Sequence, residues 1–238
     1  MSSGLIATGL RVMRGGKPVI HGIDLAVEPG RITALLGANG AGKSSLVLAL
    51  AGALSASGGV ITLDGKAVNG MRPEALRRLG VAAVPEGHKV LSELTVKENL
   101  RVAGTHLRRA EMERGVAQAL ETFPELRGRL DVRAGQLSGG QQQMVVLAQA
   151  IVSGPRYLLA DELSFGLAPV IVARLVPVIS RLAEMGVGVL LIEQFTQVAL
   201  KIAHHAYVME RGRIRFAGEP RELVSNPRIL HSAYLAPG

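Results

Sequence analysis

The sequence predicts an α/β fold with a mixed sheet at its core, an antiparallel β layer and an inserted helical lobe. Two observations predict it: strand-like and helical runs alternate along most of the chain, and strand signals vanish in one central stretch, where helix signals replace them. Alternating strands and helices give parallel strands that are covered on both faces. We therefore expect a single domain over residues 1–238, with its core at 1–90 and 137–238 and the helical lobe at about 91–136.

The antiparallel layer is predicted in the N-terminal part of the chain. Two short β-type runs, 5–13 and 19–27, are parted by two glycines, which is typical of a hairpin. A second hairpin is expected at 60–63, where an Asp-Gly pair follows an apolar run. These strands would form a layer beside the main sheet.

The remaining elements are predicted from apolar periodicity and capping signals. Thr95-x-x-Glu98 is a capping box and residues 110–120 are charged and amphipathic, so the central lobe is expected to be helical. The other predicted elements are strands at 31–36, 81–84, 157–160 and 187–192, helices at 45–50, 74–79, 142–152 and 170–184, a hairpin at 206–209 and 213–217, and short helices reaching residue 234.

Composition limits the class of protein. Hydrophobic residues make up 48% of the 238, which excludes a disordered chain, while the apolar runs fall short of the roughly 20 residues that a membrane span needs. The N-terminus shows no signal-peptide pattern, and the lack of Cys is compatible with a reducing compartment. We expect a soluble protein.

The charge balance points to an anionic partner. A net charge of +8 would suit nucleic acid, but aromatic residues are only 3% of the chain, there is no Trp, and the Lys and Arg residues are scattered. We therefore expect anionic lipid headgroups or an acidic protein partner, and no nucleic acid.

A phosphate-binding loop is predicted at residues 37–44, which match the pattern G-x-x-x-x-G-K-[ST] between a strand and a helix. Its glycines let backbone N–H groups turn toward phosphate, and the helix start adds partial positive charge. Lys43 is expected to bridge the β- and γ-phosphates of a nucleoside triphosphate, and the Ser44 hydroxyl to ligate Mg²⁺. The predicted nucleotide-binding residues are Gly37, Ala38, Asn39, Gly40, Ala41, Gly42, Lys43, Ser44 and Ser45.

Two carboxylates end the strand at 157–160, at the sheet edge where ligands of parallel sheets bind. Asp161 is expected to hold Mg²⁺ through its water shell. Glu162 is expected to act as general base for the attacking water or to orient it.

A second anion cradle is predicted where Ser138, Gly139, Gly140 and Gln141 begin a helix. The phosphate loop already grips the one γ-phosphate of a nucleotide. This cradle should therefore serve a nucleotide that another molecule holds.

These three motifs, in this order and spacing, resemble the ATP-binding subunits of ABC transporters, and the resemblance spans the whole chain. It implies a phosphate-loop NTPase fold of the ABC ATPase type and a head-to-tail dimer with two ATP molecules between one subunit's phosphate loop and the other's Ser138 motif. The stretches 84–87, 137–144 and 166–169 resemble the ATPases of branched-chain (hydrophobic) amino-acid importers. The likeness is strongest to the one of their two paired subunits that carries Glu-Gln where most relatives have His.

Three positions depart from the family's general pattern. Arg14 stands where many relatives stack an aromatic residue on adenine, and its guanidinium plane can still lie on the ring. Glu86 replaces the usual Gln. It would bind Mg²⁺ or the water that attacks the γ-phosphate; the alternative is that it is an ordinary exposed loop residue. Gln194 replaces the switch His, so its amide can donate to the γ-phosphate but cannot carry a proton's charge. For His88, His204 and His205 we expect surface roles.

The resemblance implies an ATPase engine of an importer for branched-chain amino acids, bound peripherally at the cytoplasmic face of the cell membrane. Its cofactors would be ATP and Mg²⁺. Its partners would be a membrane-spanning permease, a sister ATPase subunit in a heterodimer or a second copy of itself, and, indirectly, a solute-binding protein. Two alternatives stay open: a soluble ABC-type ATPase that acts on nucleic acid or the ribosome, and a regulatory subunit that binds ATP with little hydrolysis.

Overall fold

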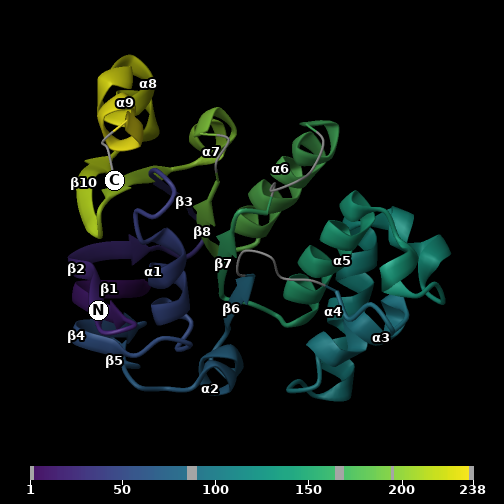
Figure 1. Ribbon diagram of the computed structural model, residues 1–238. Helices are drawn as coiled ribbons and strands as arrows, with labels where there is room; N and C mark the ends of the chain where they lie inside the picture. Colours follow the sequence, from purple (N-terminus) through teal and green to yellow (C-terminus); the bar gives the residue numbers. More distant parts are fainter. Residues whose placement is uncertain (1–2, 85–89, 164–168, 194–195, 236–238) are drawn as a thin grey trace.

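The computed structural model describes residues 3–84, 90–163, 169–193 and 196–235. Two sheets lie side by side around a central helix, and a cluster of helices extends to one side of them (Figure 1). In the described part of the chain, no helix is both long enough and apolar enough to cross a membrane. The α/β fold with a mixed sheet and an antiparallel layer is confirmed.

The antiparallel layer is a four-stranded sheet in the order β2-β1-β4-β5. Its strands are β1 (Leu5–Arg14), β2 (Lys17–Val27), β4 (Ala56–Leu63) and β5 (Lys66–Ala67). Buried and exposed residues tend to alternate along β1 and β2, because only one face of this sheet packs against the core. Both predicted hairpins are present, each with its ends within about four residues of the prediction.

The main sheet has six strands in the order β10-β9-β3-β8-β7-β6. They are β3 (Ile32–Leu36), β6 (Val81–Val84), β7 (Tyr157–Asp161), β8 (Gly188–Ile192), β9 (His205–Glu210) and β10 (Arg213–Gly218). All neighbouring pairs are parallel except β9 with β10. Every residue of β3, β7 and β8 is buried, as expected for central strands covered on both faces.

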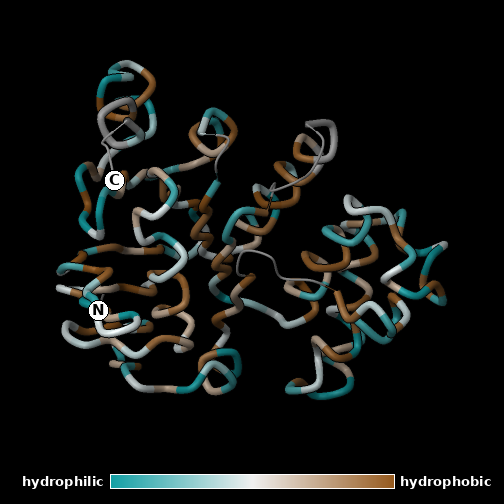
Figure 2. Tube along the Cα trace, in the orientation of Figure 1, coloured by the Kyte–Doolittle hydropathy of each residue, from teal (hydrophilic) through white to brown (hydrophobic). Residues whose placement is uncertain are grey.

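Helix α1 (Lys43–Leu50) lies between the two sheets. Its buried Leu46, Val47 and Leu50 join a core cluster to which β1, β2, β7 and β8 also contribute. Figure 2 shows the hydrophobic colour concentrated on the strands of the main sheet and on the helices that flank them. The position of α1 fixes the loop before it at the carboxyl end of β3.

The lobe consists of helices that pack on one another beyond β6. They are α3 (Val96–Ala103), α4 (Arg109–Thr122), short 3₁₀ turns and α5 (Gly139–Val152). The capping box of Thr95 and Glu98 is confirmed, and the fully buried Asn99 amide donates to the carbonyls of Leu91, Leu94 and Thr95. Since α5 packs against α3 and α4, this cluster continues past residue 136.

The remaining helices complete the layers around the sheet. They are α2 (Pro73–Arg78), α6 (Pro169–Glu184), α7 (Thr196–Ile202), α8 (Pro220–Ser225) and α9 (Pro227–Leu235). Helices α8 and α9 lie beyond β10 at the end of the chain (Figure 1). Helix α9 packs against β9, which places the C-terminal helix near the start of the phosphate loop.

Candidate functional site

A cavity of about 790 Å³ lies at the carboxyl end of the main sheet, between the phosphate loop and the β1–β2 hairpin. It brings together Arg14, Lys43 and Glu162, which come from three distant parts of the sequence. Its lining residues are Arg14, Pro18, Val19, His21, Asn39, Gly40, Gly42, Lys43, Ser44, Ser45, Glu162, Arg211 and Gly212. The cavity is thus the place where a nucleotide would sit.

The phosphate loop takes a backbone shape that requires glycine. Gly37, Gly40 and Gly42 have φ values of 148°, 81° and 104°. A Cβ on Gly37 would run into the carbonyl oxygen of Met209, and one on Gly42 would lie 3.0 Å from the carbonyl oxygen of Val19. Backbone of β9 therefore packs against Gly37 and backbone of β2 against Gly42 so closely that neither position has room for a side chain.

The start of α1 is built as an anion site. Its N-cap, Gly42, has no side chain to cap the helix, and no acidic residue stands in the first turn. Lys43, Ser44 and Ser45 line the cavity. The N–H groups of the first turn have no acceptor within the helix, so they and the positive end of the helix dipole can bind phosphate oxygens.

Lys43 carries a fixed positive charge at the floor of this cavity. The residue is only 6% exposed, and its Nζ donates to the carbonyl oxygens of Gly37 at 2.8 Å and Ala38 at 3.1 Å. These bonds hold the ammonium group inside the loop. An ammonium group held there can bind anionic phosphate oxygens with charge-assisted hydrogen bonds.

The two carboxylates leave β7 in different environments. Asp161 is the last residue of β7 and is 2% exposed, whereas Glu162 is half-buried and lines the cavity. Glu162 has a φ of 53°, and its N–H donates to the carbonyl of Ile192 at 2.9 Å. A left-handed backbone at a residue other than glycine is uncommon and tends to occur at functional sites.

The donor chemistry of this corner fits Mg²⁺. The Ser44 hydroxyl lines the cavity, and carboxylate and hydroxyl oxygens are the hard ligands that Mg²⁺ prefers. Among the described residues, no group of three or more His, Cys, Asp and Glu side chains could hold a metal ion. The candidate ligands are Asp161, the last residue of β7, and Ser44, in the first turn of α1, two elements that pack against each other.

The β1–β2 hairpin and the β9–β10 turn form the outer wall. Arg14 closes the hairpin opposite Lys17, at the place where the sequence predicts contact with the base. The turn between β9 and β10 also lines the cavity. It is held there because the Gly212 N–H donates to the Ala41 carbonyl at 2.8 Å and the Gly212 carbonyl accepts from the His21 N–H at 2.9 Å. Sequence reasoning missed His21, Arg211 and Gly212, because nothing local links residue 212 to the loop.

The Ser138 motif does not line this cavity. Ser138 is the N-cap of α5, and its hydroxyl accepts from the Gln141 N–H at 3.4 Å. The Gln141 side chain in turn accepts from the Ser138 N–H at 3.1 Å, which completes a capping box. Within one subunit this motif therefore caps α5 at a distance from the phosphate loop's cavity.

Glu86, Gln194 and His88 lie outside the described residues, as does most of the stretch 166–169. The two other His residues of interest have structural contacts. His204 Nδ1 accepts from the Ile32 N–H at 3.0 Å, and the His205 ring packs edge-on against Tyr207 at 4.7 Å. His204 is exposed and His205 is half-buried, so the expectation that they have surface roles stays a prediction, although the His204 ring also holds the first residue of β3.

A network of polar groups holds the opposite end of β7. The Tyr157 hydroxyl donates to Asp64 at 2.8 Å, and Arg156 forms an ion pair with the same carboxylate at 2.6 Å. Burial opposes ionisation of Asp64, but the hydrogen bonds from Tyr157 and Gly4 and the charge of Arg156 outweigh it and lower the pKa of Asp64. Burial and the contact with Asp64 raise the pKa of Tyr157 to about 12.

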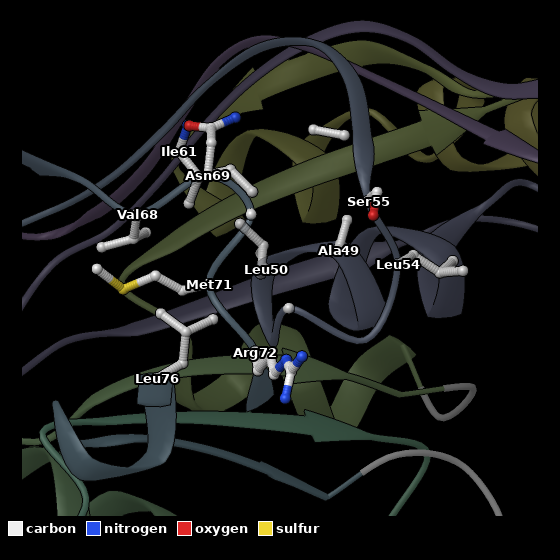
Figure 3. A pocket seen from close by; sticks show the side chains of 13 residues that line it. Ala49, Leu50, Leu54, Ser55, Ile61, Val68, Asn69, Met71, Arg72 and Leu76 are labelled. Atoms are coloured by element: carbon white, nitrogen blue, oxygen red, sulfur yellow. The ribbon is translucent and has the colours of Figure 1, made fainter. Parts of the chain in front are cut away.

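A second hollow, of about 150 Å³, lies between the end of α1, β4 and α2 (Figure 3). Aliphatic side chains including Leu50, Val68 and Leu76 surround it, and Asn69 on its rim binds the Ile61 N–H and the Gly59 carbonyl. None of the predicted site residues lines it. The nucleotide cavity is therefore the one at the phosphate loop.

Comparisons with known proteins agree with this geometry. The family described as ABC transporter matches residues 20–164. The chain is 41% identical to the high-affinity branched-chain amino acid transport ATP-binding protein BraG of Pseudomonas aeruginosa, over 91% of this chain and 92% of that protein. It is 32% identical to the corresponding protein BraF of the same organism, over 97% of each. A solved ATP-binding cassette of an ABC transporter in its ADP conformation has a TM-score of 0.84 at 26% identity, over 97% of this chain and 98% of that one.

Proposed function

The chain belongs to the ABC transporter family and is an ATP-hydrolysing subunit of that type, and from this premise we propose that it powers an importer for branched-chain amino acids. One observation carries the proposal. This protein has a cavity that brings Arg14, Lys43 and Glu162 together, and it is 41% identical, over 91% of its length, to a branched-chain amino acid transport ATP-binding protein.

The site residues predicted from the sequence have distinct tasks in ATP hydrolysis. Backbone N–H groups at the start of α1 hold the phosphates and Lys43 neutralises them. Ser44 and Asp161 would hold Mg²⁺, with Glu86 as a further candidate, and the ion would neutralise charge that develops on the phosphate oxygens. Glu162 takes a proton from the attacking water or orients that water.

A second ATPase subunit completes the site. The Ser138 motif lies outside its own subunit's cavity, so it would bind the nucleotide of a partner in a head-to-tail dimer, while the partner's motif would bind this one's. BraG and BraF are two branched-chain amino acid transport ATP-binding proteins of one organism, and this chain resembles both. We therefore favour a heterodimer with a sister subunit, and we assign Gln194 to the γ-phosphate switch.

A permease would dock where the core meets the lobe. A cavity of about 400 Å³ lies there, lined by residues of α2, β6, α3 and α5. Leu91 and Val102, which line it, are 46% and 43% exposed and so offer apolar surface to a partner. Docking here would place the chain peripherally at the cytoplasmic face of the membrane, with the lobe moving relative to the core as ATP binds.

Reconstitution tests this function directly. The chain would be assembled in vesicles with the sister ATPase and the permease, and phosphate release measured with solute-binding protein loaded with leucine, with glutamate, or empty. We expect slow hydrolysis by the isolated chain and a marked rise in the leucine-loaded complex, because each site takes half its donors from the other subunit.

Three outcomes would contradict parts of this proposal. Fast, cooperative hydrolysis by the chain alone, with a nucleotide-bound homodimer in solution, would refute the pairing. Co-purification with ribosomes instead of membranes would favour the soluble ATPase. ATP binding without turnover in the full complex would favour a regulatory subunit.

A further inference from the structure

Tyr234, near the end of α9, joins two segments that flank the nucleotide site. Its hydroxyl accepts a hydrogen bond from the Gly37 N–H at 3.3 Å. The same hydroxyl lies 3.2 Å from the hydroxyl of Thr196, the first residue of α7. One phenol oxygen therefore connects the start of the phosphate loop with the segment that follows β8, although 197 and 38 residues separate the partners along the chain.

The bridge lies just beyond the end of a strand pair. Strands β3 and β8 are parallel neighbours, and Leu35 opposite Ile192 is the last pair in their ladder. Gly37 leaves β3 and Thr196 begins the helix after β8, so no backbone ladder holds these two positions together. The Tyr234 hydroxyl supplies a connection there, at the sheet edge where Glu162 also binds the Ile192 carbonyl.

Tyr234 is not one of the residues that line the nucleotide cavity. Gly37 does not line it either, and the loop residues that do are Asn39, Gly40 and Gly42 to Ser45. Gly37 is held on another side by Met209, whose carbonyl oxygen leaves no room for a Cβ. The start of the loop is thus fixed by β9 and by α9 while the cavity stays open to ligand.

We propose that Tyr234 is a positioning residue for ATP hydrolysis, which aligns the phosphate loop with Thr196 at the start of α7. This proposal rests on the proposed function, which assigns Gln194, two residues before Thr196 in the sequence, to the γ-phosphate. Loss of the bridge should leave ATP binding almost intact, because the N–H groups that line the cavity are unaffected. It should lower kcat about 2- to 10-fold, the range that one net hydrogen bond gives, because the two segments would be aligned in fewer molecules.

The first experiment removes the hydroxyl alone. Tyr234→Phe in the assembled complex should lower kcat with the KM for ATP changed less than about twofold, and it should speed amide hydrogen exchange at Gly37. Tyr207→Phe is a matched control, because the Tyr207 hydroxyl accepts from the Ala26 N–H at 3.2 Å but does not touch the site. Wild-type kcat in Tyr234→Phe, or an equal loss of kcat in Tyr207→Phe, would overturn the proposal.

A double-mutant cycle tests the bridge itself. Thr196→Ser keeps a hydroxyl and should keep turnover, whereas Thr196→Val should lower kcat about as much as Tyr234→Phe. The double variant Thr196→Val, Tyr234→Phe should lose no more than either single variant. Additive losses would show that the two hydroxyls act independently and would refute the bridge.

These measurements separate this proposal from the transport function. Basal ATP hydrolysis and Gly37 exchange do not depend on which solute is carried. A complex that ignores leucine would refute the importer assignment, while an unchanged Gly37 amide in Tyr234→Phe would refute the bridge.

Discussion

Replacement of Lys43 by Met tests whether the loop holds phosphate. Met keeps an unbranched stem of similar length and removes the charge and the donors. Charge-assisted hydrogen bonds contribute roughly 1.5–3 kcal/mol, so ATP should bind about 10- to 150-fold more weakly. The variant also loses the bonds to the Gly37 and Ala38 carbonyls, so the free energy of unfolding should fall by about 1–3 kcal/mol.

A comparison of nucleotides makes this test specific. Isothermal titration with ATP and with AMP should show a large loss for ATP and little for AMP, because Lys43 is assigned to the β- and γ-phosphates. Lys66→Met is the control, because Lys66 is an exposed residue of β5 outside the cavity. An unchanged ATP affinity, or equal losses for ATP and AMP, would show that Lys43 does not contact the terminal phosphates.

Three further variants probe the carboxylate, the loop and the end of β7. Glu162→Gln keeps the shape and removes the base, so ATP should bind while single-turnover hydrolysis falls about 10²- to 10⁴-fold; wild-type turnover would remove Glu162 from the mechanism. Gly37→Ala should weaken ATP binding and lower the melting temperature, since its Cβ meets the Met209 carbonyl, whereas Gly128→Ala, whose Cβ meets no atom, should do neither. Because folding lowers the pKa of Asp64, its stabilisation is present above the ordinary value of 3.8 and is lost as pH falls through the folded value. The difference in urea stability between wild type and Asp64→Asn should therefore shrink on acidification below about pH 4; a difference that grows there would contradict the lowered pKa.

The elements that sequence predicted well are those whose signal is local. The strands β3, β7 and β8 are runs of buried residues, and the sequence shows such runs directly because both faces of these strands are covered. The start of α5 was placed three residues too late. Gly139 and Gly140 are poor helix formers, but the capping box between Ser138 and Gln141 stabilises the first turn around them.

Parts of the site that depend on contacts between distant residues were not predictable. The phosphate loop and the carboxylates were placed because a known pattern links each residue type to its chemistry. Arg211, Gly212 and Tyr234 carry no such pattern, and they meet the loop only because β9 pairs with β3 and α9 packs on β9. The strand order that makes this possible puts β3 between β8 and β9, and no local signal encodes that order.

The anchoring of the phosphate loop shows why the C-terminal part of the chain belongs to the nucleotide site. Three glycines in eight residues make the free loop costly to order, because glycine loses the most conformational entropy on folding. The groups that restrain it come from the C-terminal part of the chain. The Met209 carbonyl packs against Gly37, the Gly212 N–H binds the Ala41 carbonyl, and the Tyr234 hydroxyl accepts from the Gly37 N–H. The loop pattern therefore specifies the chemistry, while strands and helices formed about 170–200 residues later stabilise the one backbone shape in which that chemistry can act.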